Sequence, residues 1–144
     1  MEDGDPVTSP DSDAERPRSG PDSKDGGEGG SVLKARFHQC RPLEGVESGR
    51  TCLLELIGEW VPLLPLDGWQ DLVAHSSTGR ELALVRWDLG RRGEAGFRVF
   101  VIDLDQHLVH RAPRIDGCCE KLWWSDAGAV MWRTDGGALG RFEP

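Results

Sequence analysis

The sequence predicts an all-β domain of antiparallel strands, preceded by a disordered N-terminal tail. Three observations lead to this prediction. Apolar and polar residues alternate with a period of two in several segments. Short clusters rich in Gly, Ser and Asp separate those segments, as they do at turns. The first 31 of the 144 residues contain no aromatic side chain.

The tail is defined by its composition. Residues 1–31 contain four prolines, six glycines, nine acidic and three basic side chains, so they carry −6 of the chain's net charge of −8. Such a segment buries too little apolar surface to offset the entropy lost on ordering. We therefore place the β domain at residues 32–144 and interpret the tail as a solubilising segment, with an acidic decoy for a basic partner as the alternative.

The first half of the domain contains two strand candidates. Residues 31–40, SVLKARFHQC, alternate with a period of two and predict a strand. Residues 53–57, LLELI, fit a short helix or a buried strand. We favour the strand, and Pro62 and Pro65 exclude a long helix in either case.

The second half follows a repeated order of strand, turn and strand. We expect a strand before the Ser-Ser-Thr-Gly turn at 76–79, and a second strand over 81–87. A charged hairpin loop, GRRGEAG, spans 90–96 and leads into FRVFVIDL, the most strand-like segment of the chain. The segment 107–112, HLVHRA, should then return antiparallel.

The same order recurs in CCEKLWWSDAGAVMW, residues 118–132, where Ser125 stands 49 residues after Ser76. This spacing lies within the range of about 40–50 residues for a four-stranded propeller blade. Residues 71–133 accordingly resemble the blade repeats of TolB-like and WD40-like β-propellers. The resemblance implies blade-like sheets. Because the domain has room for only about two or three blades and a closed propeller takes about four or more, we expect a small β-sandwich or assembly with other chains.

The four cysteines are interpreted as reduced thiols. Cys118 and Cys119 are neighbours, so on a strand their side chains point to opposite faces and cannot converge on one metal ion. We expect one of these two thiols in the core and the other in a crevice.

A wider zinc site would have to use His38, Cys40, Cys52, His107 and His110. The Cys-x₂-Cys spacing of a zinc knuckle is absent. His107 and His110 are expected on one strand, facing opposite ways. No metal ligand or cofactor-binding residue is therefore predicted.

Catalysis is likewise not predicted, because the sequence contains none of the nucleophile-elbow, phosphate-loop or metalloprotease motifs. Asp103 and Asp105 lie at the end of a predicted strand. Such a pair can bind a divalent cation, but acidic residues there more often hydrogen-bond the turn. We expect the turn role.

All six tryptophans fall outside the tail. Trp87, Trp123, Trp124 and Trp132 lie on predicted strands, and Trp123 and Trp124 should face opposite sides of theirs. A tryptophan on an open sheet face can anchor a partner. The candidate partner-binding residues are therefore Trp123, Trp124 and Trp87, with core packing as the alternative.

These observations favour a non-catalytic protein-binding domain, with a bacterial toxin-neutralising (immunity-type) protein as one concrete form. The alternative is a metal-binding protein or a metal-dependent enzyme that uses the His and Cys set. The partner would be another protein or a second copy. An acidic chain argues against nucleic acid, and no apolar run approaches the roughly 20 residues that span a bilayer.

The sequence also predicts a compartment. The N-terminal residues show no positively charged segment followed by an apolar one, as a secretory signal would. We therefore expect a cytoplasmic protein. Arginine outnumbers lysine, and tyrosine and asparagine are absent, which is typical of a GC-rich bacterial genome.

Overall fold

The computed structural model describes residues 33–46 and 49–144, and in these ranges the chain forms antiparallel strands and no helix. The all-β prediction is therefore confirmed. The described residues contain no helix with the length and apolarity needed to cross a membrane. The predicted tail, residues 1–31, lies outside the described residues. The strands are β1 (Lys34–Pro42), β2 (Arg50–Ile57), β3 (Trp69–His75), β4 (Glu81–Trp87), β5 (Gly96–Asp103), β6 (Leu108–Arg111), β7 (Ile115–Asp116), β8 (Cys119–Trp124), β9 (Val130–Thr134) and β10 (Leu139–Phe142).

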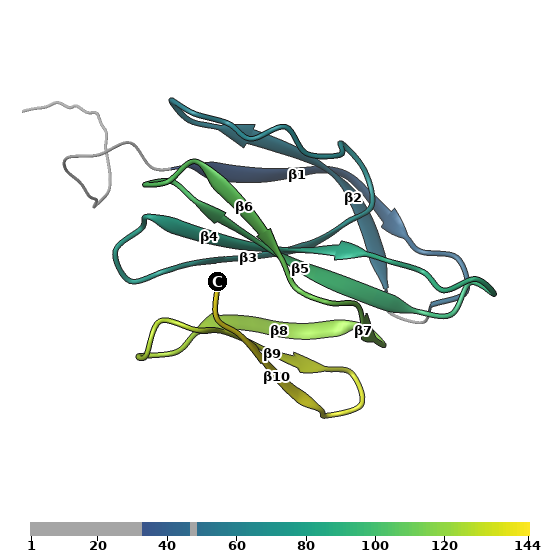
Figure 1. Ribbon diagram of the computed structural model, residues 1–144. Helices are drawn as coiled ribbons and strands as arrows, with labels where there is room; N and C mark the ends of the chain where they lie inside the picture. Colours follow the sequence, from purple (N-terminus) through teal and green to yellow (C-terminus); the bar gives the residue numbers. More distant parts are fainter. Residues whose placement is uncertain (1–32, 47–48) are drawn as a thin grey trace, which may run out of the picture. The chain divides into compact units, whose positions relative to one another are not determined.

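The strands form two sheets (Figure 1). Strands β1 to β6 pair in chain order, and β7 pairs with β5 to complete a seven-stranded sheet. Strands β8, β9 and β10 form a separate three-stranded sheet. Residues 53–57 lie in β2, so the preferred strand assignment for them is confirmed. The predicted strands at 81–87 and around 97–103 match β4 and β5 closely.

Three hairpin turns share one hydrogen-bonding pattern. A Ser or Thr begins each turn and a glycine with positive φ occupies the position three residues later; the pairs are Ser76 and Gly79, Ser125 and Gly128, Thr134 and Gly137. In each turn the hydroxyl accepts a backbone N–H from the far side at 3.1 Å. The positive φ explains the glycines, since other L residues adopt it at a cost. The first two turns are those that the sequence predicts.

Strands β4 and β5 lie between two hydrophobic cores, which explains why they are almost continuously apolar. The lower core lies between the two sheets. It consists of Ala74, Ala83, Val85, Phe97, Val99, Val101, Ala112, Cys119, Val130 and Trp132. The upper core lies on the opposite face of the seven-stranded sheet. It consists of Leu33, Leu54, Trp69, Leu82, Leu84, Phe100, Ile102 and Leu104.

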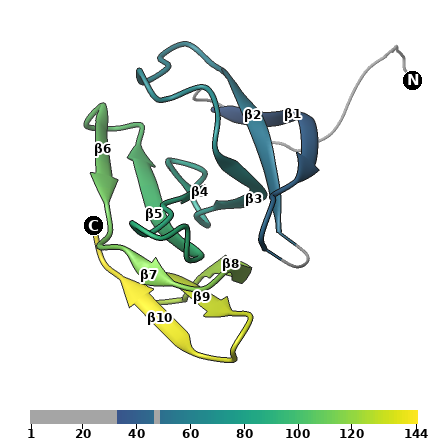
Figure 2. The ribbon, with the colours of Figure 1, turned by 90° about the vertical axis from the view of Figure 1, so that its right-hand side faces the viewer.

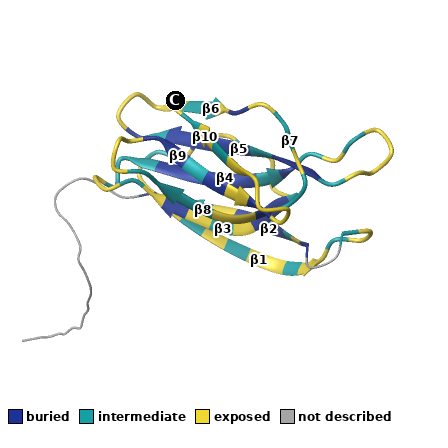
Figure 3. Cartoon of the chain, turned by 90° about the horizontal axis from the view of Figure 1, so that it is seen from below, coloured by how far each residue is buried: buried dark blue, intermediate teal, exposed yellow. Residues whose placement is uncertain are grey.

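The β1–β2 hairpin covers the upper core because it is joined to the rest of the sheet by very little pairing. Between β2 and β3 the register gives one pair, Cys52 with Trp69. In Figure 2 the hairpin stands beside β3, across from β6. Its apolar side chains pack with those of β4 and β5 in the upper core. Burial follows this arrangement: β4 and β5 are mostly buried, whereas β1 is intermediate or exposed along its length (Figure 3).

Equivalent strands of the two predicted repeats pack against each other. The side chain of Gln70 in β3 bonds both backbone groups of Cys119 in β8, 49 residues away, at 3.0 and 3.3 Å. The indole N–H of Trp124 donates to the carbonyl of Ala74 at 2.9 Å. The propeller resemblance itself stays a prediction.

Candidate functional site

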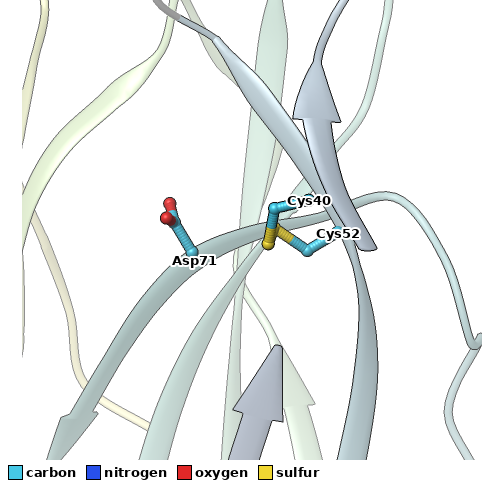
Figure 4. Close-up of side chains that lie close together, drawn as sticks. All are labelled: Cys40, Cys52 and Asp71. Atoms are coloured by element: carbon cyan, nitrogen blue, oxygen red, sulfur yellow. A yellow bond between two sulfur atoms is a disulfide. The ribbon is translucent and has the colours of Figure 1, made fainter. Parts of the chain in front are cut away.

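Cys40 of β1 and Cys52 of β2 form a disulfide (Figure 4). The interpretation of all four cysteines as reduced thiols is therefore wrong. The two residues are 12 apart in the sequence, and they meet because the hairpin pairs β1 with β2 through a register shift between His38 and Arg41. Spacing alone does not reveal such a cross-strand contact, because the register shift decides which residues stand opposite.

Asp71 lies beside the disulfide, and its carboxylate and the two sulfur atoms lie within 4.8 Å of one another (Figure 4). In the part of the chain that the structure describes, these three residues are the group whose donor atoms converge as a metal site requires. Each sulfur is bonded to the other, however, so neither is a free thiolate ligand. Asp71 itself pairs with Arg50 at 3.4 Å. The trio is thus a structural cross-link with an adjacent ion pair.

None of the histidines of the candidate zinc set belongs to this cluster. His38 bonds Glu55 at 2.7 Å. His107 lies in the turn before β6, with φ of 55°, and its ring stacks on Trp60 at 4.3 Å. The expectation that His107 lies on a strand is therefore wrong. His110 lies on β6, as predicted.

Asp103 has the turn role that the sequence predicts, and Asp105 lies in the same turn. One carboxylate oxygen of Asp103 accepts the backbone N–H groups of Asp105 and Gln106, at 2.9 and 3.0 Å. Asp105 pairs with Arg80 at 2.7 Å. Asp103 therefore closes the β5–β6 turn, whereas Asp105 joins this turn to the neighbouring β3–β4 turn through Arg80.

The two adjacent cysteines differ in burial, as expected. Cys119 is buried in the lower core, and this burial raises the pKa of its thiol to about 12. Cys118 is half-buried, and its pKa is raised by burial and by the nearby carboxylate of Asp135. Both thiols therefore stay protonated at neutral pH.

Alkylation by iodoacetamide should show this difference. The thiolate is the reactive form, so at pH 8 we expect slow modification of Cys118 and far slower modification of Cys119. Raising the pH to about 10 should accelerate Cys118 first, because the pKa of Cys119 is about 12. Mass spectrometry of the variants C118S and C119S isolates one thiol at a time. Equal rates in the folded variants would contradict the burial of Cys119.

The candidate partner-binding tryptophans occupy three different environments. Trp87 is buried, and its indole N–H donates to the carbonyl of Arg50 at 2.8 Å. Trp124 packs on the lower core. Trp123 stands on the other face of β8, with the Lys121 ammonium 5.3 Å from its ring centre. The prediction that Trp123 and Trp124 face opposite ways is confirmed, and Trp87 offers too little surface to anchor a partner.

A surface that sequence reasoning missed lies between β2 and β3. In this segment, the 58–68 loop, three aliphatic side chains point into solvent: Val61, Leu63 and Leu66 are 44%, 99% and 63% exposed. Single exposed leucines are common, but a cluster of apolar side chains at the surface usually marks a binding surface. The signal in the sequence is VPLLPL, in which prolines at 62 and 65 prevent a helix that would bury the leucines.

The loop is held in place along its inner side. Leu64 packs on the upper core, and the Trp60 ring stacks on His107. The carbonyl of Pro65 accepts the indole N–H of Trp69, and that of Leu66 accepts the N–H of Leu54, both at 2.8 Å. Figure 2 shows the loop reaching from β2 toward β6. Its exposed side chains are therefore presented in a fixed arrangement.

Comparison of the chain with protein-family models, with curated proteins and with solved structures found no match.

Proposed function

We propose that the protein is a non-catalytic binding domain that contacts a partner protein through the 58–68 loop. The observation that carries this proposal is the near-complete exposure of Leu63 on a loop whose backbone is fixed by hydrogen bonds. Exposing a leucine costs free energy that burial against a partner recovers, about 1.5–3 kcal/mol for a full side chain. A fixed loop also loses little conformational entropy on binding.

The charges of the loop suggest the chemistry of the partner. Glu59 and Asp67 are its two charged residues, and both are acidic and exposed. A complementary surface would combine an apolar pocket for Leu63 with basic side chains around it. Trp123, half-buried and outside the lower core, is a second proposed contact. An immunity-type protein is one form of this proposal, in which the partner is a toxin domain.

Site-specific photocross-linking tests the proposal. A benzophenone amino acid at position 63, introduced into the full chain in its host, should give one dominant cross-linked protein. The matched control is position 139, because Leu139 is also exposed, at 68%, but lies on β10. Cross-linking to a second copy would make the partner another copy of this chain. Equal yields from positions 63 and 139 would contradict the proposal.

A further inference from the structure

Three arginines lie side by side on the upper-core face of the seven-stranded sheet. Arg86 of β4 stands directly opposite Arg98 of β5, and Arg111 of β6 stands opposite Phe100 of β5. Positions 98 and 100 share a face because strand side chains alternate. Like charges placed directly opposite each other on neighbouring strands are destabilising. Negative charge close to these arginines would reduce the repulsion between them.

The chain supplies part of that charge. Asp88 accepts two hydrogen bonds from the Arg98 guanidinium, at 3.0 and 3.3 Å. The Arg86 side chain reaches the carboxylate of Asp67 at 3.4 Å. Arg111 lies over the Phe100 ring at 5.4 Å and forms no ion pair with a carboxylate of residues 33–46 or 49–144. Two of the three guanidinium groups thus have a carboxylate partner each, Arg98 with Asp88 and Arg86 with Asp67.

These three arginines line a pocket of about 280 Å³. Phe100 and Pro65 are among its other lining residues, so cationic donors stand beside an apolar surface. The carboxylate of Asp88, which pairs with Arg98, also lines the pocket. Sites for small molecules usually have volumes of about 300–1,000 Å³. The volume of this pocket lies just below that range, so it suits a compact ligand.

We propose that the pocket binds a small oxyanion, a phosphate or a carboxylate group, with Arg111 as its main donor and Arg98 beside it. The planar guanidinium matches the oxygens of either group and can donate two parallel hydrogen bonds to it. The bound anion would also offset the repulsion between Arg86 and Arg98. Pro65 of the 58–68 loop lines this pocket but Leu63 does not, so a variant at Leu63 leaves the lining of the pocket unchanged and the two proposals can be tested separately.

The test is a titration of the full chain with inorganic phosphate and, separately, with malonate, at constant ionic strength maintained with sodium chloride. Arginine side-chain N–H resonances are followed by NMR. We expect saturable shifts at Arg98 and Arg111. Changing Arg111→Gln should raise the Kd about tenfold or more, since a hydrogen bond to a charged group contributes about 1.5–3 kcal/mol.

Two further variants separate the site from general positive charge. Arg111→Lys keeps the charge but loses the planar fork, so its Kd should fall between those of the wild type and Arg111→Gln. Arg141→Gln removes an exposed arginine on β10 that pairs with Glu143 and should leave the Kd unchanged. Saturation by phosphate alone or malonate alone identifies the preferred group. Failure of both anions to saturate, or equal losses in Arg111→Gln and Arg141→Gln, would overturn the proposal.

Discussion

Replacing Trp69 with alanine is expected to lower the free energy of unfolding by about 3–5 kcal/mol, the usual cost of removing a buried aromatic side chain. Trp69 has no exposed surface and packs edge-on against Phe100 in the upper core. Its indole N–H also bonds Pro65, so the change should release the 58–68 loop. Urea unfolding followed by circular dichroism measures the loss.

Two variants show which interactions cause that loss. Trp69→Phe keeps most of the packing but removes the N–H donor, so it should cost less than Trp69→Ala. Trp123→Ala removes a tryptophan that stands outside both cores and should cost about 1 kcal/mol or less. Equal losses from Trp69→Ala and Trp123→Ala would contradict the placement of the upper core.

Removing the Cys40–Cys52 disulfide should be the next most costly change, about 3 kcal/mol for a closed loop of this length. The cross-link restricts the unfolded chain and joins β1 to β2, which together cover the upper core. We expect the double variant C40A/C52A to unfold at a clearly lower urea concentration than the wild type. The matched control is C118A, which removes a half-buried free thiol and should have a small effect.

A thiol count tests the disulfide directly. The unreduced protein, unfolded in guanidinium, should show two reactive thiols, those of Cys118 and Cys119. Four would mean that the cross-link is absent. Disulfides persist in oxidising compartments, so the same count on protein trapped with acid in its host also tests the predicted cytoplasmic location.

Local signals predicted most of the strands. The run FRVFVIDL is apolar and β-branched because β5 is buried on both faces, and the Ser-x-x-Gly turns are visible because their glycines need positive φ. These features depend on residues close together in the chain. The pattern of apolar and polar residues predicts structure well when the residues concerned are close together in the chain.

The remaining features depend on contacts between distant residues. The Cys40–Cys52 pair depends on the register shift in the β1–β2 hairpin. Trp87 is buried beside Arg50, whose backbone carbonyl accepts the indole N–H of the tryptophan. Leu63 is of a residue type that usually lies in a core, and only the fixed path of its loop turns it outward. None of these contacts leaves a periodic pattern in the sequence.

The proposed function is tested most directly with the partner that cross-linking identifies. Once that partner is purified, its affinity for the Leu63→Ser variant is compared with its affinity for the wild type. Leu63 is already 99% exposed in the free protein, so this change should leave folding stability unaltered and act on binding alone. Loss of one buried leucine contact predicts a Kd about 10-fold to 100-fold higher by calorimetry. The control Leu139→Ser should bind like the wild type. An unchanged Kd for Leu63→Ser, or the same rise for both variants, would contradict a binding role for the 58–68 loop.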